Sequence, residues 1–575
     1  MARLIAIDPD GCAKEPIHFS GAIQAHGYLV SCAMPEWTVR HASANIDALL
    51  GVRADALIGT SLRDHASEDV LQAILDTLSL VGPAVTAQRA GQANLGPLGT
   101  ACDLVVHVAD DLVHIEIEPR HERGMSPQPT SLAQSMISAV AHEPPQNFHD
   151  YVAAQVRELT GYDRVMVYRF LHDGTGEVIA EARSEGMEPY LGLRYPASDI
   201  PPQARALYLR NRLRVIPDVD YEPVPIVPGS VNGRPLDLSQ HALRSVSPVH
   251  LEYLRNMGVS ASMSISIIAG GRLWGLIACH HSLPRLVPPA IRAAADLFGL
   301  FVSMRVASAD QQKTLAHFEH AQQVRDALVQ RLAKARDFDA ALVEELPLLR
   351  TSLGADGAAL WSRSRWHASG HAPDPRRVAA LVDWLQQQGA VSLAASDVAA
   401  DWAAPIEGDT TAGVLGLRLG ADDWLLLFRD EQVETVRWAG EPTKALVPTD
   451  DGLRIAPRRS FAVWRESVRG RSAPWSDADR RGAARLHQVL TEQRRRIQTR
   501  TDVPMLDLQR QQVAMDERRQ RLDQLAQMLE GLTHLEAGES ARLDARIAEL
   551  ERELQRLAEV MPMPMPATEA VSVTH

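Results

Sequence analysis

Residues 195–208 of the chain read YPASDIPPQARALY, a turn-rich segment that runs into a short stretch of good helix formers. Ser198 and Asp199 are residue types that favour the N-cap of a helix, and a proline is well tolerated in the first helical turn. The local pattern therefore predicts that a helix begins here, with Ser198 or Asp199 as its N-cap and a proline just inside it.

Helix and strand patterns flank this segment on both sides. The predicted elements are a helix at about Phe148–Thr160, a β-rich run at Asp163–Phe170, and two strands at Ser262–Ile268 and Leu273–His281 around a Gly270-Gly271 turn. Ser262–Ile268 alternates small polar with apolar residues, as a half-buried strand does, so Ser262 and Ser264 should face the same way. Residues 131–308 are therefore expected to form one α+β unit.

Two further α+β units are expected around it. Residues 1–125 contain a strand at 25–32, a helix at 67–80 and a hairpin at 103–117, whereas residues 309–500 contain strands at 413–419 and 424–428 and a helix at 477–498. Residues 300–346 lack Gly and Pro, which predicts a long helix joining the second and third units. Residues 501–560 are predicted to be helical and 561–575 to be a disordered tail.

Composition excludes several classes of protein. The 575 residues suggest about four domains or fewer, and 45% hydrophobic with 23% charged residues is typical of soluble globular chains. A net charge of −13 disfavours a global attraction to nucleic acid or anionic lipid. Four cysteines without a CxxC pair predict neither a disulfide scaffold nor a zinc ribbon, and no apolar stretch approaches the length of a membrane span. A soluble, cytoplasmic protein is expected.

Segments from all three units together resemble one family. Residues 195–208, 243–258 and 274–281 resemble the chromophore-binding GAF domain of phytochromes, and residues 10–18 and 23–27 resemble the PAS domain of bacterial phytochromes. Residues 438–442, 457–461 and 464–466 are similar to the tongue of a PHY domain. The resemblance covers roughly residues 5–500 and implies an α+β fold. PAS (1–125), GAF (131–308) and PHY (309–500, tongue about 424–475) domains, each an antiparallel sheet flanked by helices, would be joined by long helices and followed by a helical or coiled-coil segment.

The resemblance implies a covalently bound bilin, biliverdin IXα, as the cofactor. In bacterial phytochromes the linking cysteine lies near the N-terminus, which implies a thioether at Cys12. Plant-type members link through a cysteine just before the motif histidine, but here Val249 precedes His250. Without the resemblance, Cys12 would be taken as a surface thiol. Cys32, Cys102 and Cys279 are expected to pack as small hydrophobic residues.

The resemblance also implies the residues of the pigment pocket. The Asp199 carbonyl, with Ile200 beside it, would accept hydrogen bonds from the pyrrole N–H groups, His250 would share an ordered water with them, and His280 would bond the ring D carbonyl. The two propionates would meet Arg214 and Arg244 and the hydroxyls of Ser247, Ser262 and Ser264, and ring D would lie among Tyr168, Tyr195 and Tyr208. No metal site is expected at Cys279-His280-His281, because adjacent strand residues point to opposite faces.

The tongue is expected to be the switch. Phe461–Val468 fits both a strand and a helix period, as a bistable element requires. By resemblance, illumination isomerises the pigment about its C15=C16 bond and breaks an Asp199–Arg458 ion pair. The tongue, with Trp438 and Trp464, then refolds and the helices of a homodimer rearrange.

The output end shows no recognisable enzyme. Residues after 500 are too few for a kinase, His534 lacks the usual following proline, and no ATP-lid motif follows, so no enzymatic activity is expected. Eight Arg and no Lys against fourteen acidic residues in 501–575 argue against nucleic-acid binding. The leucine stripes there leave open a self-packing helical hairpin, a dimer seam or a docking surface for a separate effector. A cyclic-nucleotide-like GAF sensor is the alternative function, and an enzyme, either a kinase or a bilin-modifying catalyst, is a third.

Overall fold

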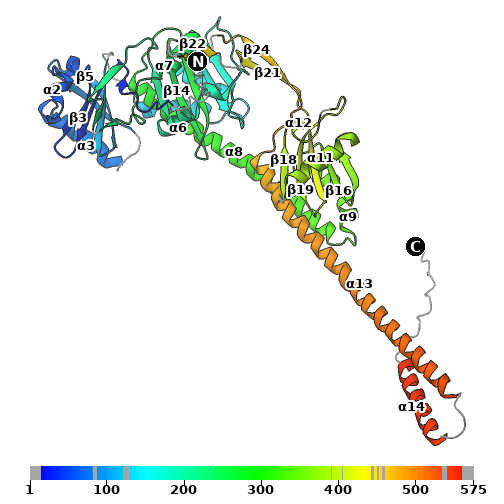
Figure 1. The fold of residues 1–575 in the computed structure, drawn as a ribbon. Coiled ribbons are helices and arrows are strands. Elements are labelled where there is room, and N and C mark those ends of the chain that lie inside the picture. The colour runs from blue at the N-terminus through cyan, green and yellow to red at the C-terminus, as the bar shows by residue number, and fades with distance from the viewer. Residues whose placement is uncertain are drawn as a thin grey trace, which may run out of the picture. The chain divides into compact units, whose positions relative to one another are not determined.

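The computed structural model describes residues 15–81, 87–120, 128–231, 233–389, 392–404, 406–441, 446–449, 452–455, 460–533 and 540–559 (Figure 1). The chain divides into two compact units. The first comprises residues 1–316 with 432–469, and the second comprises 317–431 with 470–575. One helix, α8 (Pro289–Leu332), runs from the first unit into the second. The absence of Gly and Pro from residues 300–346 predicts a long helix here, and the observed helix ends at Leu332, before the end of that range.

The N-terminal domain of the first unit is an antiparallel sheet with the strand order β1-β11-β3-β2-β6-β5-β4. Its own strands are β1 (Ala22–Ile23), β2 (Tyr28–Ala33), β3 (Thr38–Ser43), β4 (Gln88–Leu95), β5 (Thr100–Ala109) and β6 (Leu112–Pro119). Its helices are α1 (Asp47–Leu50), α2 (Ala54–Leu57), the 3-10 turn η2 (Leu62–Asp64) and α3 (Glu68–Val81). The predicted hairpin and helix are both confirmed.

Both faces of strand β6 are buried. Val113, Ile115 and Ile117 point into the domain's hydrophobic core, as the strand period requires. The alternate residues His114, Glu116 and Glu118 point to the other face, yet they are at most 5% exposed. A polar face is buried here because a segment of the second domain covers it: both Glu116 carboxylate oxygens accept backbone N–H groups, from Ala242 and Leu243. We call residues 224–231 and 233–244 the covering segment.

This covering segment also encloses the N-terminal strand. β11 (Val224–Val227) leaves the second domain to pair with both β3 and β1. On the opposite edge of β1, the Gln24 N–H donates to the Leu243 carbonyl over 2.7 Å. The Gln24 side chain, 1% exposed, donates to the Val215 carbonyl over 3.0 Å. One excursion of the second domain therefore holds both edges of β1, an arrangement that the sequence patterns do not predict.

The second domain is built on a sheet with the order β10-β14-β15-β7-β8-β9-β21-β24. Its strands are β7 (Arg164–Phe170), β8 (Gly176–Arg183), β9 (Arg194–Tyr195), β10 (Leu213–Ile216), β14 (Ala261–Ala269) and β15 (Arg272–His281), and a small hairpin is formed by β12 (Ser230–Val231) and β13 (Arg234–Pro235). Its helices are α4 (Pro129–Val140), α5 (Phe148–Thr160), the 3-10 turn η3 (Ala197–Asp199), α6 (Pro202–Arg210) and α7 (Pro248–Asn256). Helices α4, α5 and the start of α8 pack on one face of the sheet around Val152 and Phe298.

Strands β21 (Glu434–Ala439) and β24 (Val463–Val468) come from a distant part of the chain and extend this sheet. They pair antiparallel, with Trp438 opposite Trp464, and β21 pairs in parallel with β9 at Arg194. A shorter hairpin, β22 (Leu446–Thr449) with β23 (Gly452–Ile455), lies between them in sequence. We call residues 432–469 the tongue hairpin. Its second strand contains most of the segment whose sequence fits both a strand and a helix.

The second unit has its own sheet, in the order β17-β16-β20-β19-β18. Its strands are β16 (Gly357–Ser362), β17 (Arg365–Gly370), β18 (Leu393–Ser396), β19 (Thr411–Arg418) and β20 (Trp424–Asp430), and its helices are α9 (Phe338–Glu344), α10 (Leu346–Ser352), α11 (Pro375–Gln387), α12 (Ala399–Trp402), α13 (Asp477–Thr533) and α14 (Ser540–Glu559). Strand β20, which opens the range expected for the tongue, lies in the middle of this sheet.

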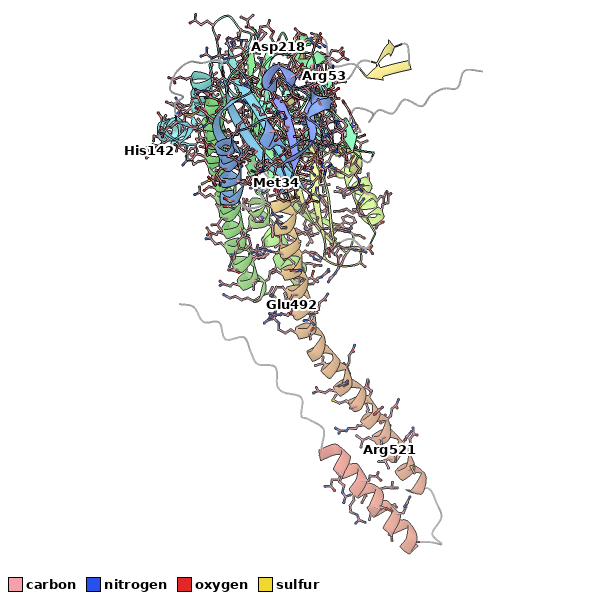
Figure 2. The ribbon with its side chains drawn as sticks, turned by 90° about the vertical axis from the view of Figure 1, so that its left-hand side faces the viewer. Met34, Arg53, His142, Asp218, Glu492 and Arg521 are labelled. Carbon is pink, nitrogen blue, oxygen red and sulfur yellow. The ribbon has the colours of Figure 1, made fainter. Side chains whose placement is uncertain are left out.

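Helix α13 joins two segments that the sequence patterns predict as separate helical regions, 477–498 and the first part of 501–560. It was expected to end near residue 498 but continues to Thr533, because the added residues are mostly strong helix formers. Figure 2 shows Glu492 and Arg521 along its length, with α14 beside its C-terminal part. Among the described residues, no helix is both long and apolar enough to cross a membrane.

A buried ion pair fastens β6 to helix α8. The Arg292 guanidinium donates to the Glu118 carboxylate, and both side chains are at most 7% exposed. Burial alone would raise the pKa of Glu118, but the charges of Arg292 and His26 outweigh it and hold that pKa below its ordinary value. The pair therefore joins the first domain to the second.

We expect Glu118→Gln to lower the stability of the full chain by about 3 kcal/mol at pH 7, because it leaves a buried guanidinium without its carboxylate. Since folding depresses the pKa of Glu118, the stability from the ionised carboxylate is present at neutral pH and is lost as the pH falls through the folded-state pKa. Calorimetric unfolding at pH 7 and at pH 4 measures both effects.

The matched control is Asp296→Asn on the same helix. Asp296 pairs with Arg212 in a partly exposed bridge, so its loss should cost about 1 kcal/mol or less. Equal effects of the two variants would contradict a joining role for the Glu118–Arg292 pair.

Candidate functional site

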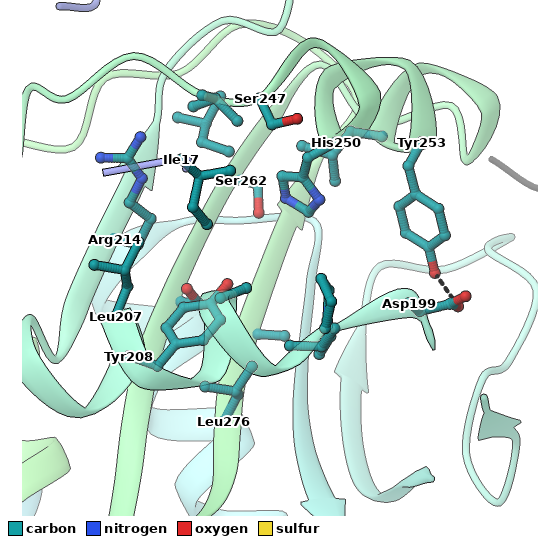
Figure 3. A pocket seen from close by; sticks show the side chains of 18 of the residues that line it. Ile17, Asp199, Leu207, Tyr208, Arg214, Ser247, His250, Tyr253, Ser262 and Leu276 are labelled. Atoms are coloured by element: carbon teal, nitrogen blue, oxygen red, sulfur yellow. Dashed lines mark hydrogen bonds between the residues drawn. The ribbon is translucent and has the colours of Figure 1, made fainter. Parts of the chain in front are cut away.

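A cavity of about 230 Å³ lies on the face of the second domain's sheet opposite α5. Helices α6 and α7 and strands β10, β14 and β15 line it, and Figure 3 shows Tyr208 of α6 and His250 of α7 on opposite sides of the space. Every described residue for which the resemblance implied a pocket role lines this cavity: Tyr168, Tyr195, Asp199, Ile200, Tyr208, Arg214, Arg244, Ser247, His250, Ser262, Ser264 and His280. The geometry brings them together, while their roles toward a pigment stay predictions.

Strand register places the residues that the strands contribute to the cavity. Ser264 lies opposite Arg214 on one neighbouring strand and Ala278 on the other, and Ser262 lies opposite Ile216 and His280. Alternation along β15 sends Cys279 into the hydrophobic core and His280 into the cavity. The expected opposition of neighbouring residues in Cys279-His280-His281 is therefore confirmed.

The helix start in the 195–208 segment differs from the local prediction. Pro202 is the first residue of α6, as predicted for a proline in the first turn, but the N-cap position is Pro201 and carries no side-chain hydrogen bond. Ser198 and Asp199 lie in the preceding 3-10 turn instead. The prediction of Ser198 or Asp199 as N-cap was wrong, and this displacement places both residues in the wall of the cavity.

Two buried arginines dominate the electrostatics. The Arg214 guanidinium donates to the carbonyls of Ala242 and Arg244, and the Arg244 guanidinium donates to the Ile17 carbonyl over 2.9 Å. Within the described ranges, the partners of both guanidinium groups are backbone carbonyls and not carboxylates. Burial, and then repulsion from Arg214, lowers the pKa of Arg244 to about 9, and burial lowers that of Arg214. Such a pair stabilises an anion in the cavity.

Two neutral histidines face the same space. Burial, followed by the charge of Arg214, lowers the pKa of His250 to about 4, and burial, followed by Arg164 and His250, lowers that of His280 to about 3. The buried His280 Nδ1 has no hydrogen-bond partner among the described residues. A neutral imidazole has one donor and one acceptor nitrogen, so it can bond a carbonyl or an N–H group.

One aromatic chain connects the cavity wall to the tongue hairpin. The Tyr253 hydroxyl donates to the Asp199 carboxylate over 3.0 Å (Figure 3). The Tyr253 ring stacks with His250 and meets the Phe461 ring edge-on, with the centroids 5.2 Å apart. Tyr253 was not predicted to have a role. It lies three residues after His250, a spacing that places both on one helix face and could have identified it.

The other residues expected to switch lie in the tongue hairpin. The Trp438 indole N–H donates to the Glu466 carboxylate over 2.7 Å, and Trp464, directly opposite Trp438, is 39% exposed. Arg458 lies outside the described residues, so the expected Asp199–Arg458 pair is not tested.

The first described residues of the chain lie against the cavity. Glu15 and Ile17 both line it, and the Ser247 hydroxyl donates to the Glu15 carboxylate over 2.9 Å. Neither residue was predicted to line a site. Cys12 lies outside the described residues, three positions before Glu15. Cys32, Cys102 and Cys279 are fully buried, as expected.

Three family models match consecutive parts of the chain. They are a PAS fold at residues 12–120, a GAF domain at 145–306 and a phytochrome region at 321–498. In structure, the chain is similar to the wild-type phytochrome photosensory core module of Stigmatella aurantiaca. That comparison has a TM-score of 0.71 at 36% identity and covers 84% of this chain and 98% of that one.

Curated relatives give the same result. The chain is 37% identical to a bacteriophytochrome of Pseudomonas aeruginosa, over 86% of this chain and 67% of the relative. It is 35% identical to a bacteriophytochrome of Xanthomonas campestris, over 87% and 81%. It is also 35% identical to cyanobacterial phytochrome B of Nostoc sp., over 84% and 66%, so it spans about two thirds of that protein's length.

Fold, cavity and relatives agree with the resemblance read from the sequence. The chain therefore belongs to the phytochrome family of photoreceptors and carries a bacteriophytochrome photosensory module of PAS, GAF and PHY domains.

Proposed function

We propose that the protein is a red/far-red light sensor that holds biliverdin in the GAF cavity. The observation that carries this proposal is the pair of buried guanidinium groups, Arg214 and Arg244, facing a mainly apolar cavity without a carboxylate partner in the described chain. Biliverdin offers two propionate carboxylates on a flat, conjugated and largely apolar body, which matches both features.

The rest of the lining supports the same ligand. His280, with its buried Nδ1 lacking a described partner, would hold the pigment's terminal ring, and His250 would share an ordered water with its pyrrole N–H groups. Ser262 and Ser264 would add hydroxyl donors beside the arginines. Tyr168, Tyr195 and Tyr208 would limit the space in which that ring turns. Bound biliverdin would supply absorption of red light and isomerisation about its C15=C16 bond.

Cys12 is the proposed attachment residue. It precedes Glu15, which lines the cavity, by three residues, and three residues span at most about 11 Å. Val249, which precedes His250 and also lines the cavity, offers no thiol for attachment from the GAF side. Of the four cysteines, the other three are buried in hydrophobic cores, where burial raises the pKa of Cys102 to about 11 and that of Cys32 to about 12.

The tongue hairpin is the proposed signal relay. Asp199 is bonded to Tyr253, and Tyr253 contacts Phe461, so a change at the cavity wall reaches the hairpin through two contacts. We propose that an Asp199–Arg458 pair adds a third contact, and that the hairpin refolds as a helix on illumination. The helices of a homodimer would then carry the change to a separate effector, without kinase activity in this chain.

Biliverdin should become covalently attached to the wild-type chain and not to Cys12→Ser. The thioether requires the thiol, whereas the arginines and histidines that bind the pigment remain. Retention of red absorbance after denaturation measures attachment. Cys102→Ser is the control, because its buried thiol bonds the Thr100 carbonyl far from the cavity residues. Attachment that survives Cys12→Ser, or is lost equally in Cys102→Ser, would contradict the assignment.

Arg244→Gln should weaken binding of biliverdin by roughly 30-fold, about 2 kcal/mol, because one charge-assisted contact to a propionate is lost. Binding of biliverdin dimethyl ester, which carries no carboxylate, should change little. Titration of the pigment-free chain by absorbance measures both affinities.

The control for charge is Arg255→Gln, because Arg255 bonds the exposed Asp220 and does not line the cavity. If Arg244→Gln weakened the diester as much as the diacid, the arginine would be a structural residue and the proposed anion site would be wrong.

Gly440→Ala should destabilise the hairpin form of the tongue by about 1–2 kcal/mol or more. Gly440 has a φ of +85°, and an added Cβ would lie 2.1 Å from the Ser460 carbonyl oxygen. If light exchanges the hairpin for a helix, the variant should show less strand-to-helix change in light-minus-dark infrared spectra.

Gly270→Ala is the matched control, since Gly270 also has a positive φ but nothing within 4 Å of an added Cβ. An unchanged infrared difference in Gly440→Ala would contradict the role of the hairpin as the refolding element.

A further inference from the structure

Three histidines meet at the junction of the PAS and GAF domains, apart from the pigment cavity. His107 on β5 and His114 on β6 are directly opposite each other in the strand register. His241 comes from the covering segment of the GAF domain, which packs on this face of the sheet. Their ring centroids are 4.5–4.8 Å apart, and each side chain is at most 1% exposed.

The hydrogen bonds of this cluster are incomplete within the described residues. Neither ring nitrogen of His107 has a partner, and neither ring nitrogen of His241 has one. Only His114 is anchored, by the Ser31 hydroxyl at 2.8 Å and by the Ala109 carbonyl at 3.2 Å. Buried polar atoms are nearly always bonded, so four such nitrogens in one place indicate a missing partner.

The chemistry of the three side chains indicates which class of ligand would bond these ring nitrogens. One nitrogen from each ring lies within 4.8 Å of those from the other two rings. Imidazole nitrogens without thiolates or carboxylates suit zinc and related divalent ions, which bind nitrogen at about 2.0–2.1 Å. Small side-chain rotations would bring each of the three nitrogens to about 2.0–2.1 Å from one shared zinc ion.

Ser31 has the position of a supporting residue. Metal-binding histidines commonly use one nitrogen for the ion and bond the other to an oxygen, which fixes the ring. His114 already has two oxygen partners, and the ion would replace one of them.

We propose that His107, His114 and His241 form a buried zinc site that fastens the covering segment of the GAF domain to the PAS sheet. The site would join strands β5 and β6 to a residue more than a hundred positions later in the chain. It lies outside the pigment cavity, whose lining contains none of the three. The proposal therefore does not depend on the pigment.

The first test measures zinc in the full chain, purified from zinc-supplemented medium without pigment and dialysed against metal-free buffer. We expect about one zinc per chain. His107→Gln and His241→Gln should each lose most of it, while His149→Gln keeps it, because His149 stacks on Trp274 in the GAF domain. Removal of the metal with a chelator should lower the thermal unfolding temperature of the wild-type chain, and added zinc should restore it.

A second measurement does not rely on variants that could fail to fold. Cobalt added to the metal-depleted wild-type chain should give the strong visible bands of a tetrahedral nitrogen site, and zinc should displace it. Wild-type protein that binds neither ion, or that keeps its zinc in both cluster variants, would overturn the proposal. In the first case, buried water would be the partner of the four nitrogens.

Discussion

Two buried guanidinium groups, those of Arg214 and Arg244, determine both the charge of the cavity and the attachment of two chain segments at the centre of the first unit. Arg214 binds the carbonyls of Ala242 and Arg244, and Arg244 binds the carbonyl of Ile17, so the same side chains that face the cavity also hold the covering segment and the N-terminal segment in place. Burial makes each charge costly unless it meets an acceptor or an anion. The backbone carbonyls meet part of this requirement, and an anionic ligand would meet the rest. Pocket chemistry and domain attachment therefore depend on the same two residues.

Local patterns predicted the elements well wherever a segment is regular and packs on one face. Helix α5 has the predicted bounds, and strands β14 and β15 extend the predicted ones by one or two residues. The ordered motifs of the family placed every described pocket residue around one cavity. The predicted N-cap of α6 was wrong because Ser198 and Asp199 lie in a preceding 3-10 turn, where they form part of the cavity wall. The end of α13 was wrong because the helix continues through Pro504 into the segment that was predicted as a separate helical region.

Contacts between distant segments could not be read from local patterns. β11 leaves its own domain to join the PAS sheet, and β21 extends the GAF sheet from more than 200 residues away. The polar side chains of β6 have the alternation of a solvated face, yet the covering segment buries them. The sequence did not predict the cluster of His107, His114 and His241 for the same reason, since their spacing in sequence matches no metal motif. Only the fold brings them together.

Reversible photoconversion tests the central claim most directly. The full chain, loaded with biliverdin, should exchange a red-absorbing for a far-red-absorbing band under one colour of light and return under the other, and the spectrum after long darkness would identify the ground state. A chain that binds biliverdin in the cavity but shows no light-driven exchange, or that binds no pigment at all, would contradict the account of a light sensor. The GAF cavity would then have to be examined as a site for a different small anion.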